Sequence, residues 1–184
     1  MNQKGFTLLE VLIAIVISSI VLGVVFIFFN TALVSWGQID KNYIIEQQWS
    51  VFTSYLKEDL HNVFISPLST RTNFVGNSSK IEWTVFGKNE FNLVSYCFDP
   101  YKSLLNRKVV NIEGEKIISE KTFFANADLQ DINFYYYDRK NNYWKNSWSF
   151  KEENSVPLSV KVELKFVNNE VPPVIINLFI NKEY

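Results

Sequence analysis

Few side chains in this sequence could carry chemistry. His61 is the single histidine and falls on a predicted helix without a Ser or Cys partner pattern, so we expect it to be structural or solvated. Cys97 is the single cysteine, which excludes an intrachain disulfide. It lies between Tyr96 and Phe98 in a predicted strand, where we expect it to act as a buried small hydrophobe. These residues do not predict a catalytic nucleophile.

The acidic side chains offer no stronger catalytic pattern. Glu58 and Asp59 are adjacent, so they cannot share one face of a helix. Asp128 and Asp131 could ligate calcium in a loop, although two acids make a weak motif. The sequence has no glycine-rich phosphate loop, no paired-cysteine spacing and no His-Glu-x-x-His pattern. We therefore predict no enzyme activity, no cofactor and no metal site.

Glu10 is the acid in the most unusual position. It directly precedes residues 11–29, which carry no charge and have only Ser18 and Ser19 as polar side chains. As a helix this run spans roughly 28 Å, which is close to the ~30 Å hydrocarbon core of a bilayer. A carboxylate in such a segment costs ~2.5–3.5 kcal/mol at mid-membrane, so it is rarely present without a function. The alternative is that Glu10 reaches the membrane interface and has no function.

Three interpretations of the N-terminus compete. A secretory signal peptide has an apolar core of ~7–15 residues and a small-residue cleavage site, whereas this run is longer and ends in aromatic residues. A plain single-pass anchor leaves Glu10 unexplained. The third, which we favour, is an anchor in which Glu10 has a function. Lys4 precedes the run and Asp40 is the next charge after it, so the positive-inside rule predicts a cytoplasmic N-terminus and an external chain after about Thr31.

One long helix is predicted to connect this anchor to the rest of the chain. Apolar residues recur at helical spacing after the membrane run: Ile45, Trp49, Phe52, Leu56, Leu60 and Val63. The residues between them, Asp59 included, form the predicted solvated or subunit-facing side. Pro67 ends the pattern because proline disfavours helix in the residue before it. We predict a helix from Phe6 to near Ile65, with a bend or break at Gly37.

The remaining sequence predicts antiparallel strands. Residues 68–79 are rich in Thr, Asn, Gly and Ser, which indicates a loop. Strands are predicted at residues 81–85, 91–98, 104–110, 112–118, 132–137, 143–150, 157–166 and 174–180, with a hairpin turn at 138–142. Because no helical stretch separates these strands, we expect an α+β fold with one long N-terminal helix packed on an antiparallel sheet.

Residues 4–10, Lys-Gly-Phe-Thr-Leu-Leu-Glu, resemble the leader junction of type IV prepilins and of the pseudopilins of type II secretion systems. The resemblance implies that prepilin peptidase cuts between Gly5 and Phe6 and N-methylates Phe6. The new amine would lie about one helical turn from Glu10. In a bundle of parallel, axially shifted copies, the amine of one subunit can meet Glu10 of its neighbour and favour one offset. The resemblance implies a pilin-like division into a leader at 1–5, a transmembrane helix at 6–30, an amphipathic continuation at 31–66 and a β-rich head at 67–184.

Four later features resemble the J-type minor pseudopilin of type II secretion: residues 56–60, 94–96 with 105–107, 134–137 with Trp144 and Trp148, and 156–162. This resemblance implies a structural subunit at the tip of the pseudopilus, in the inner membrane with its head in the periplasm or outside. I-type and K-type minor subunits and the major pseudopilin would be its partners. A minor pilin of a type IV pilus or DNA-uptake system is the alternative, and an anchored adhesion module is another. With 18 basic and 19 acidic residues, the chain does not predict nucleic-acid binding.

Overall fold

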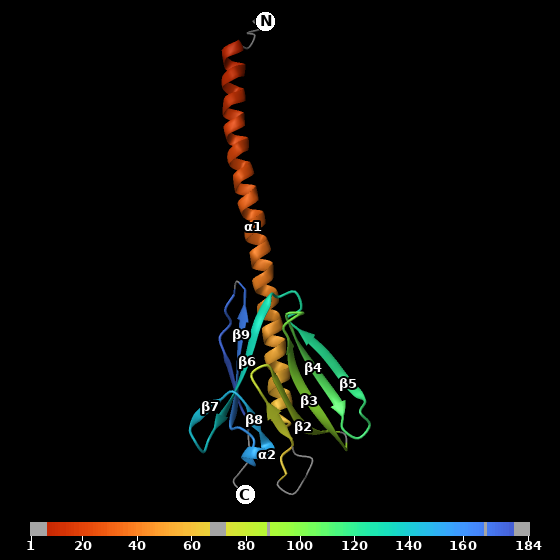
Figure 1. Ribbon diagram of the computed structural model, residues 1–184. Helices are drawn as coiled ribbons and strands as arrows, with labels where there is room; N and C mark the ends of the chain where they lie inside the picture. Colours follow the sequence, from red (N-terminus) through yellow and green to blue (C-terminus); the bar gives the residue numbers. More distant parts are fainter. Residues whose placement is uncertain (1–6, 67–72, 88, 168, 179–184) are drawn as a thin grey trace. The chain divides into compact units, whose positions relative to one another are not determined.

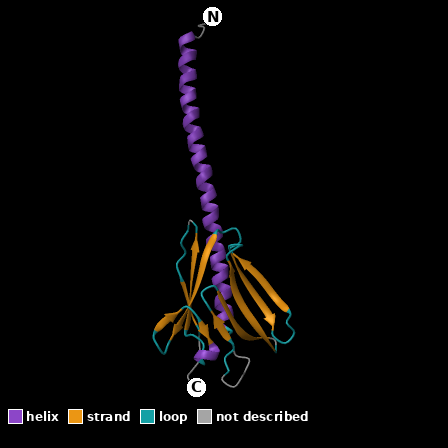
Figure 2. Ribbon diagram, in the orientation of Figure 1, coloured by secondary structure: helices purple, strands orange, loops and turns teal. Residues whose placement is uncertain are grey.

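The computed structural model describes residues 7–66, 73–87, 89–167 and 169–178, with the side chains of residues 36–42 outside the description. The chain divides into two compact units, Met1–Tyr43 and Ile44–Tyr184. We call them the anchor unit and the head unit and describe each by itself. Helix α1, Leu8–His61, contributes residues to both units (Figures 1 and 2).

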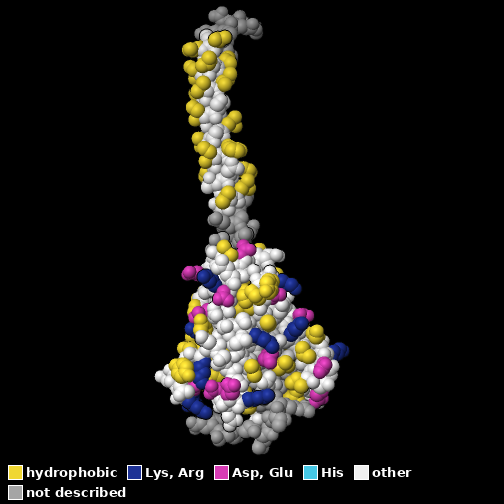
Figure 3. Space-filling model, in the orientation of Figure 1, with side chains coloured by type: hydrophobic (Ala, Val, Ile, Leu, Met, Phe, Trp, Pro, Cys, Tyr) yellow, Lys and Arg dark blue, Asp and Glu magenta, His cyan; other side chains and the backbone are white. Residues whose placement is uncertain are grey.

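The anchor unit is an exposed apolar helix. Leu8–Ser35 is long and apolar enough to cross a membrane, and Figure 3 shows hydrophobic side chains along its surface. Its few hydroxyl groups donate to carbonyl oxygens one turn earlier: Ser19 to Ile15 at 2.8 Å and Thr31 to Ile27 at 2.9 Å. These bonds satisfy the hydroxyls within the helix, as a hydrocarbon environment requires.

The predicted course of α1 is correct in its main part and wrong at its end. The helical backbone continues through Gly37, so of the predicted bend or break the break is absent, and the helix ends at His61, before the predicted end near Ile65. The chain leaves the helix early because it joins the sheet. The Phe64 amide donates to the carbonyl of Thr84 at 2.8 Å, and Val63 forms an isolated bridge with Val85.

The head unit contains two antiparallel sheets. The first has the order β5-β4-β3-β2-β1-β8 and the second the order β10-β9-β6-β7. The first sheet consists of β1 Phe74–Gly76, β2 Lys80–Gly87, β3 Glu90–Asp99, β4 Leu104–Asn111, β5 Ile117–Phe123 and β8 Trp148–Ser149. The second consists of β6 Leu129–Asp138, β7 Tyr143–Lys145, β9 Ser159–Phe166 and β10 Val174–Asn177. A short helix, α2 Phe150–Glu153, follows β8. The expected α+β architecture is thus confirmed.

Three predicted segments differ from the structure. The predicted loop at residues 68–79 contains β1, which is too short for an alternation signal and is held by pairing with β2 and β8. Residues 112–116 form a turn instead of a strand, so β5 begins only at Ile117. The predicted strand at 143–150 divides into β7 and β8 before α2 begins.

The core of the head forms around the buried face of α1. Ile45, Phe52, Leu56 and Leu60 of the predicted stripe are buried, and Trp49 is half-buried. The ring centroid of Phe52 lies 6.0 Å from that of Tyr96 on β3 and 5.6 Å from that of Phe124. Phe124 in turn lies 5.5 Å from Phe166 on β9. One helix face therefore contacts the first sheet directly and reaches the second through Phe124.

Candidate functional site

Thr7 and Glu10 form a reciprocal cap at the start of α1. The Thr7 amide donates to Glu10 Oε2 at 2.9 Å, and the Thr7 hydroxyl donates to the same oxygen at 3.1 Å. The Glu10 amide donates to Thr7 Oγ1 at 3.3 Å. This is the capping-box arrangement, in which a threonine and a glutamate three residues later satisfy amides at the helix start. Gly5 and Phe6, the predicted cleavage and methylation residues, lie outside the described residues.

The cap leaves the charge of Glu10 in place. Thr7 supplies neutral donors, so the carboxylate gains hydrogen bonds without being neutralised. A negative charge in the first helical turn is also favoured by the helix dipole. Glu10 is therefore an oriented carboxyl group at the start of an apolar helix, where a cation from outside the helix could pair with it.

Small side chains follow Glu10 along the anchor helix. Ala14 and Ser18 lie at successive spacings of four residues from it, and together with Leu22 they line a shallow depression of about 490 Å³. Small residues on one face allow two membrane helices to approach closely. The face that carries Glu10 can therefore accept a neighbouring helix.

Asp59 is buried, which corrects the prediction that it lies on the solvated side. Its Oδ2 accepts from Arg107 Nε on β4 at 2.6 Å and from the Tyr96 hydroxyl on β3 at 2.6 Å, and its Oδ1 accepts from Arg107 Nη2 at 2.7 Å. The Asp59 carbonyl accepts from Trp83 Nε1 on β2 at 3.0 Å. Asp59 on α1 thus accepts hydrogen bonds from residues of three strands.

The electrostatics of this cluster keep Arg107 protonated and Tyr96 neutral. Hydrogen bonding to Asp59 raises the pKa of Arg107. Burial raises the pKa of the Tyr96 hydroxyl, and the negative charge of Asp59 raises it further, so Tyr96 stays a neutral donor. The sequence did contain a signal for this position, because Asp59 is seven residues after Phe52 and three after Leu56, on the same helix face.

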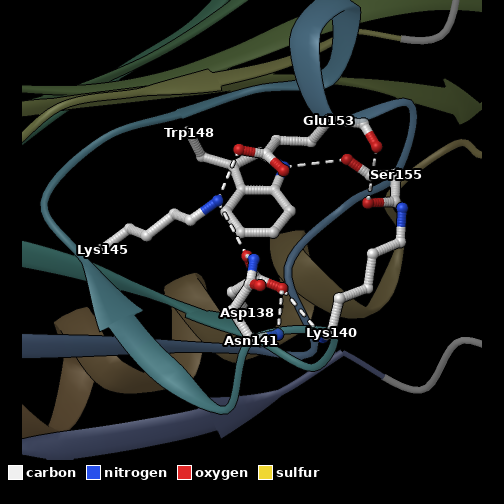
Figure 4. Close-up of polar contacts among 7 residues, drawn as sticks. All are labelled: Asp138, Lys140, Asn141, Lys145, Trp148, Glu153 and Ser155. Carbon is white, nitrogen blue, oxygen red and sulfur yellow. Dashed lines mark hydrogen bonds and ion pairs between the residues drawn. The ribbon is translucent and has the colours of Figure 1, made fainter.

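A second ionic cluster was not predicted from the sequence (Figure 4). Lys145 Nζ lies 2.8 Å from Asp138 Oδ2 and 2.6 Å from Glu153 Oε1, and Asn141 Nδ2 donates to Asp138 Oδ2 at 2.7 Å. The hydrogen bond from Lys145, followed by that from Asn141, lowers the pKa of Asp138. Asp138 and then Glu153 raise the pKa of Lys145. The turn at residues 138–142 was predicted from the sequence. The contact between Glu153 and Lys145 depends on the position of α2, and no local sequence pattern indicates it.

A cleft of about 630 Å³ adjoins this cluster, with Lys80, Glu82, Lys145 and Trp148 in its walls. Its lysines are paired, because Lys80 lies 2.5 Å from Glu82 and Lys145 contacts two carboxylates. Trp148 Nε1 donates to the Ser155 carbonyl at 2.8 Å. Lys145 and Trp148 thus hold the segment around α2 in place, which is a structural role.

The other candidate residues do not form a reactive site. His61 is the last residue of α1 and is exposed, as is Glu58. Cys97 is exposed, which corrects the prediction that it is buried. It alternates on β3 with Tyr96 and Phe98, whose side chains face the core, so its own points to the opposite side.

The two candidate calcium ligands, Asp128 and Asp131, lie directly before and within β6. Asp131 accepts from the Ile132 amide at 2.9 Å and from Asn133 Nδ2 at 3.0 Å, and Asp128 has a positive φ of 54°. Within the described part of the chain, no group of three or more His, Cys, Asp or Glu side chains could hold a metal ion.

Comparison with known proteins finds a match at the N-terminus. Residues 1–26 match the family model described as the prokaryotic N-terminal methylation motif. A search of curated proteins returned no match. The chain thus carries the signal of type IV pilin and pseudopilin precursors, on a helix suited to membrane anchoring. This motif implies processing by prepilin peptidase and assembly with other pilin subunits.

Proposed function

We propose that this chain is a minor pseudopilin of the J type, a non-enzymatic subunit at the tip of a type II secretion pseudopilus. The observation that carries the proposal is Glu10, a charged residue held at the start of an exposed apolar helix within the methylation motif. Such a subunit needs a helix that can leave the bilayer and a head that binds other heads.

Processing is proposed at the junction of Gly5 and Phe6, followed by N-methylation of Phe6. Residues 1–5 would be the leader, 6–30 the transmembrane helix, 31–66 its continuation and 67–184 the head. The helix would cross the cytoplasmic membrane once with its N-terminus inside, and the head would lie in the periplasm or outside.

Assembly would depend on a charge pair between subunits. Removal of the leader leaves a positive amine on Phe6, and a neighbouring copy shifted along the helix axis can present Glu10 to it. Each charge is costly to bury alone and less so when paired. Because Thr7 holds Glu10 without neutralising it, the carboxylate is available to that amine, and the pair would select one axial offset.

The J-type assignment is supported by how the resembling segments meet in the head. Asp59 of residues 56–60 pairs with Arg107 of residues 105–107, and Tyr96 of residues 94–96 is the cross-strand partner of Arg107. Phe134 of β6 is the cross-strand partner of Val162 of β9, so two further segments also lie side by side. I-type and K-type subunits and the major pseudopilin are the proposed partners.

Deletion of the gene in the producing organism tests this function against the alternative. The proposal predicts that secretion of the exported proteins is lost while pili and DNA uptake persist, and that the full-length chain restores secretion. Loss of pili or DNA uptake with normal secretion would instead assign the chain to a type IV pilus or DNA-uptake system.

A further inference from the structure

The tight turn between β1 and β2 carries an acceptor motif for N-glycosylation. Asn77-Ser78-Ser79 fits the pattern Asn-x-Ser/Thr, in which the middle residue is anything but proline. Of the asparagines in the chain, only Asn77 has Ser or Thr two residues later, so the motif predicts a single site. A glycan is bulky and needs a surface position. The structure of the turn therefore decides whether the motif is usable.

The turn is fixed through its backbone and exposed through its side chains. Asn77, Ser78 and Ser79 are all exposed. The Ser78 carbonyl accepts from the amide of Phe134 on β6 at 2.9 Å, and the Ser79 carbonyl accepts from the amide of Phe98 on β3 at 3.0 Å. Main-chain bonds to strands of both sheets thus hold the turn while its three side chains stay at the surface.

The Asn77 carboxamide is oriented by the residues that follow it. Its Oδ1 accepts from the Ser79 amide at 2.9 Å, from the Lys80 amide at 2.8 Å and from the Ser79 hydroxyl at 3.2 Å. This is the Asx-turn arrangement. All three bonds come from described residues and end on Oδ1, and Nδ2, the atom that carries an N-linked glycan, takes part in none of them. The motif hydroxyl therefore contacts the acceptor carboxamide without occupying its nitrogen.

The space beside Asn77 is open and polar. Asn77 lies in the wall of the cleft of about 630 Å³, whose walls also carry Lys80, Glu82, Ser147 and Glu152. Ammonium, carboxylate and hydroxyl groups have several hydrogen-bonding positions each, which suit the hydroxyl groups of a sugar. A sugar attached to Asn77 thus meets hydrogen-bonding side chains in a cleft instead of the packed core of the head.

We propose that Asn77 is the acceptor of an N-linked glycan. The donor is an oligosaccharide carried on a lipid diphosphate. In the transfer, Asn77 Nδ2 forms a bond to the anomeric carbon of the sugar and loses one proton, while the bond from that carbon to the diphosphate oxygen breaks and the lipid diphosphate leaves. This inference depends on the proposed function only in that the head lies outside the cytoplasm, where such acceptors are modified.

Mass spectrometry of the peptide that contains Asn77, taken from the mature full-length chain of native cells, tests the proposal. We expect a mass increase by whole sugar residues and fragment ions that place the increase on Asn77. A peptide found only in its unmodified form, or with its sugar on Ser78 or Ser79, overturns the proposal.

Two neighbouring hydroxyl deletions provide a matched pair of variants. Ser79→Ala destroys the motif but keeps both amide bonds to Asn77 Oδ1, so the turn should form and the sugar should be lost. Ser78→Ala removes the adjacent hydroxyl and leaves the motif intact, so the sugar should remain, as it should in Ser79→Thr. Retention of the sugar in Ser79→Ala, or its loss in Ser78→Ala, contradicts attachment through the motif.

Thiol labelling separates this inference from the proposed function. Cys97 is exposed and is the single cysteine of the chain. In spheroplasts, a maleimide that does not cross the cytoplasmic membrane labels it only if the head lies outside. A labelled Cys97 with an unmodified Asn77 overturns only the glycan inference. If Cys97 is labelled only after lysis and Asn77 is unmodified, the proposed location of the head fails as well.

Discussion

At the scale of single residues, Glu10 has a local role that can be separated from the role in assembly proposed for it. The structure shows it as the acceptor of a capping box with Thr7. Glutamine serves in that box as well as glutamate, so the cap depends on an acceptor and not on a charge. The proposed pairing with the amine of a neighbouring subunit would depend on the charge.

Glu10→Gln is therefore expected to insert in the membrane and to keep its helix start, but to assemble poorly. Assembly is measured by the amount of the chain recovered in complexes with other pilin subunits, and insertion by membrane fractionation. We expect at least about a tenfold loss of assembled chain, equivalent to loss of a buried charge pair. The companion variant Thr7→Val removes the cap hydroxyl but keeps the carboxylate, and should assemble far better. Normal assembly by Glu10→Gln would remove the role proposed for its charge.

Asp59 shows how a residue can be misassigned when only polarity is considered. Its spacing from Phe52 and Leu56 places it on the buried face, and Arg107 and Tyr96 compensate its burial. Removal of one partner of a buried ion pair leaves an unpaired charge, which is more costly than loss of the pair.

Asp59→Asn is expected to lower the free energy of unfolding of the head by about 3–5 kcal/mol. Urea unfolding followed by tryptophan fluorescence measures this, because Trp83 donates to the same residue. The matched control is Glu120→Gln, which removes an exposed pair with Lys108 at 3.4 Å and should cost under about 1 kcal/mol. Equal effects of the two substitutions would show that the buried pair contributes no special stability.

At the scale of elements, β1 depends on a glycine because a tyrosine of the second sheet approaches its backbone. The Tyr136 hydroxyl donates to the Asn77 carbonyl at 2.9 Å, and a Cβ on Gly76 would overlap that hydroxyl. The φ of Gly76 is not positive, so the need for glycine comes from the close approach alone. This contact joins β6 of one sheet to β1 of the other.

Gly76→Ala should accordingly destabilise the head by about 1–3 kcal/mol through overpacking. Thermal unfolding of the purified chain measures the change. Gly87→Ala is the control, since a Cβ there has no neighbour within 4 Å, and it should be neutral or slightly stabilising. If both alanine variants unfold at the same temperature, the close approach at Gly76 is not a constraint.

Prediction from the sequence was most accurate where a segment carries a strong periodic pattern of apolar residues. The long helix, the strands around Trp83, Tyr96 and Val162, and their antiparallel order follow from repeating patterns that each segment carries in itself. β1, β8 and α2 are two to four residues long and exist because of partners distant in the sequence, so no local pattern marks them. Likewise, one must know which elements meet in order to predict the ion pair Asp59–Arg107 and the ionic cluster Asp138–Lys145–Glu153.

The candidate site at Glu10 could also be predicted from local sequence patterns. Glu10 could be singled out from sequence because a lone acid before a long apolar run is costly in a membrane. Its cap with Thr7 follows the Thr-x-x-Glu spacing at the helix start.

At the scale of the whole molecule, the anchor unit and the head unit have different tasks. The anchor unit exposes apolar side chains along Leu8–Ser35, which only lipid or other helices can cover. The head unit has its own core of buried aromatic and aliphatic side chains. In the proposed assembly, the anchor would move from lipid into a helix bundle while the head stays folded.

The proposed assembly requires processing between Gly5 and Phe6, so the mature chain from its native cells provides the most direct test of it. Mass spectrometry of the intact protein and of its N-terminal peptide is expected to show a chain that begins at Phe6 with one methyl group on its amine. A chain that still begins at Met1, or one that has lost the whole apolar segment, would contradict the proposed processing and the assembly that depends on it.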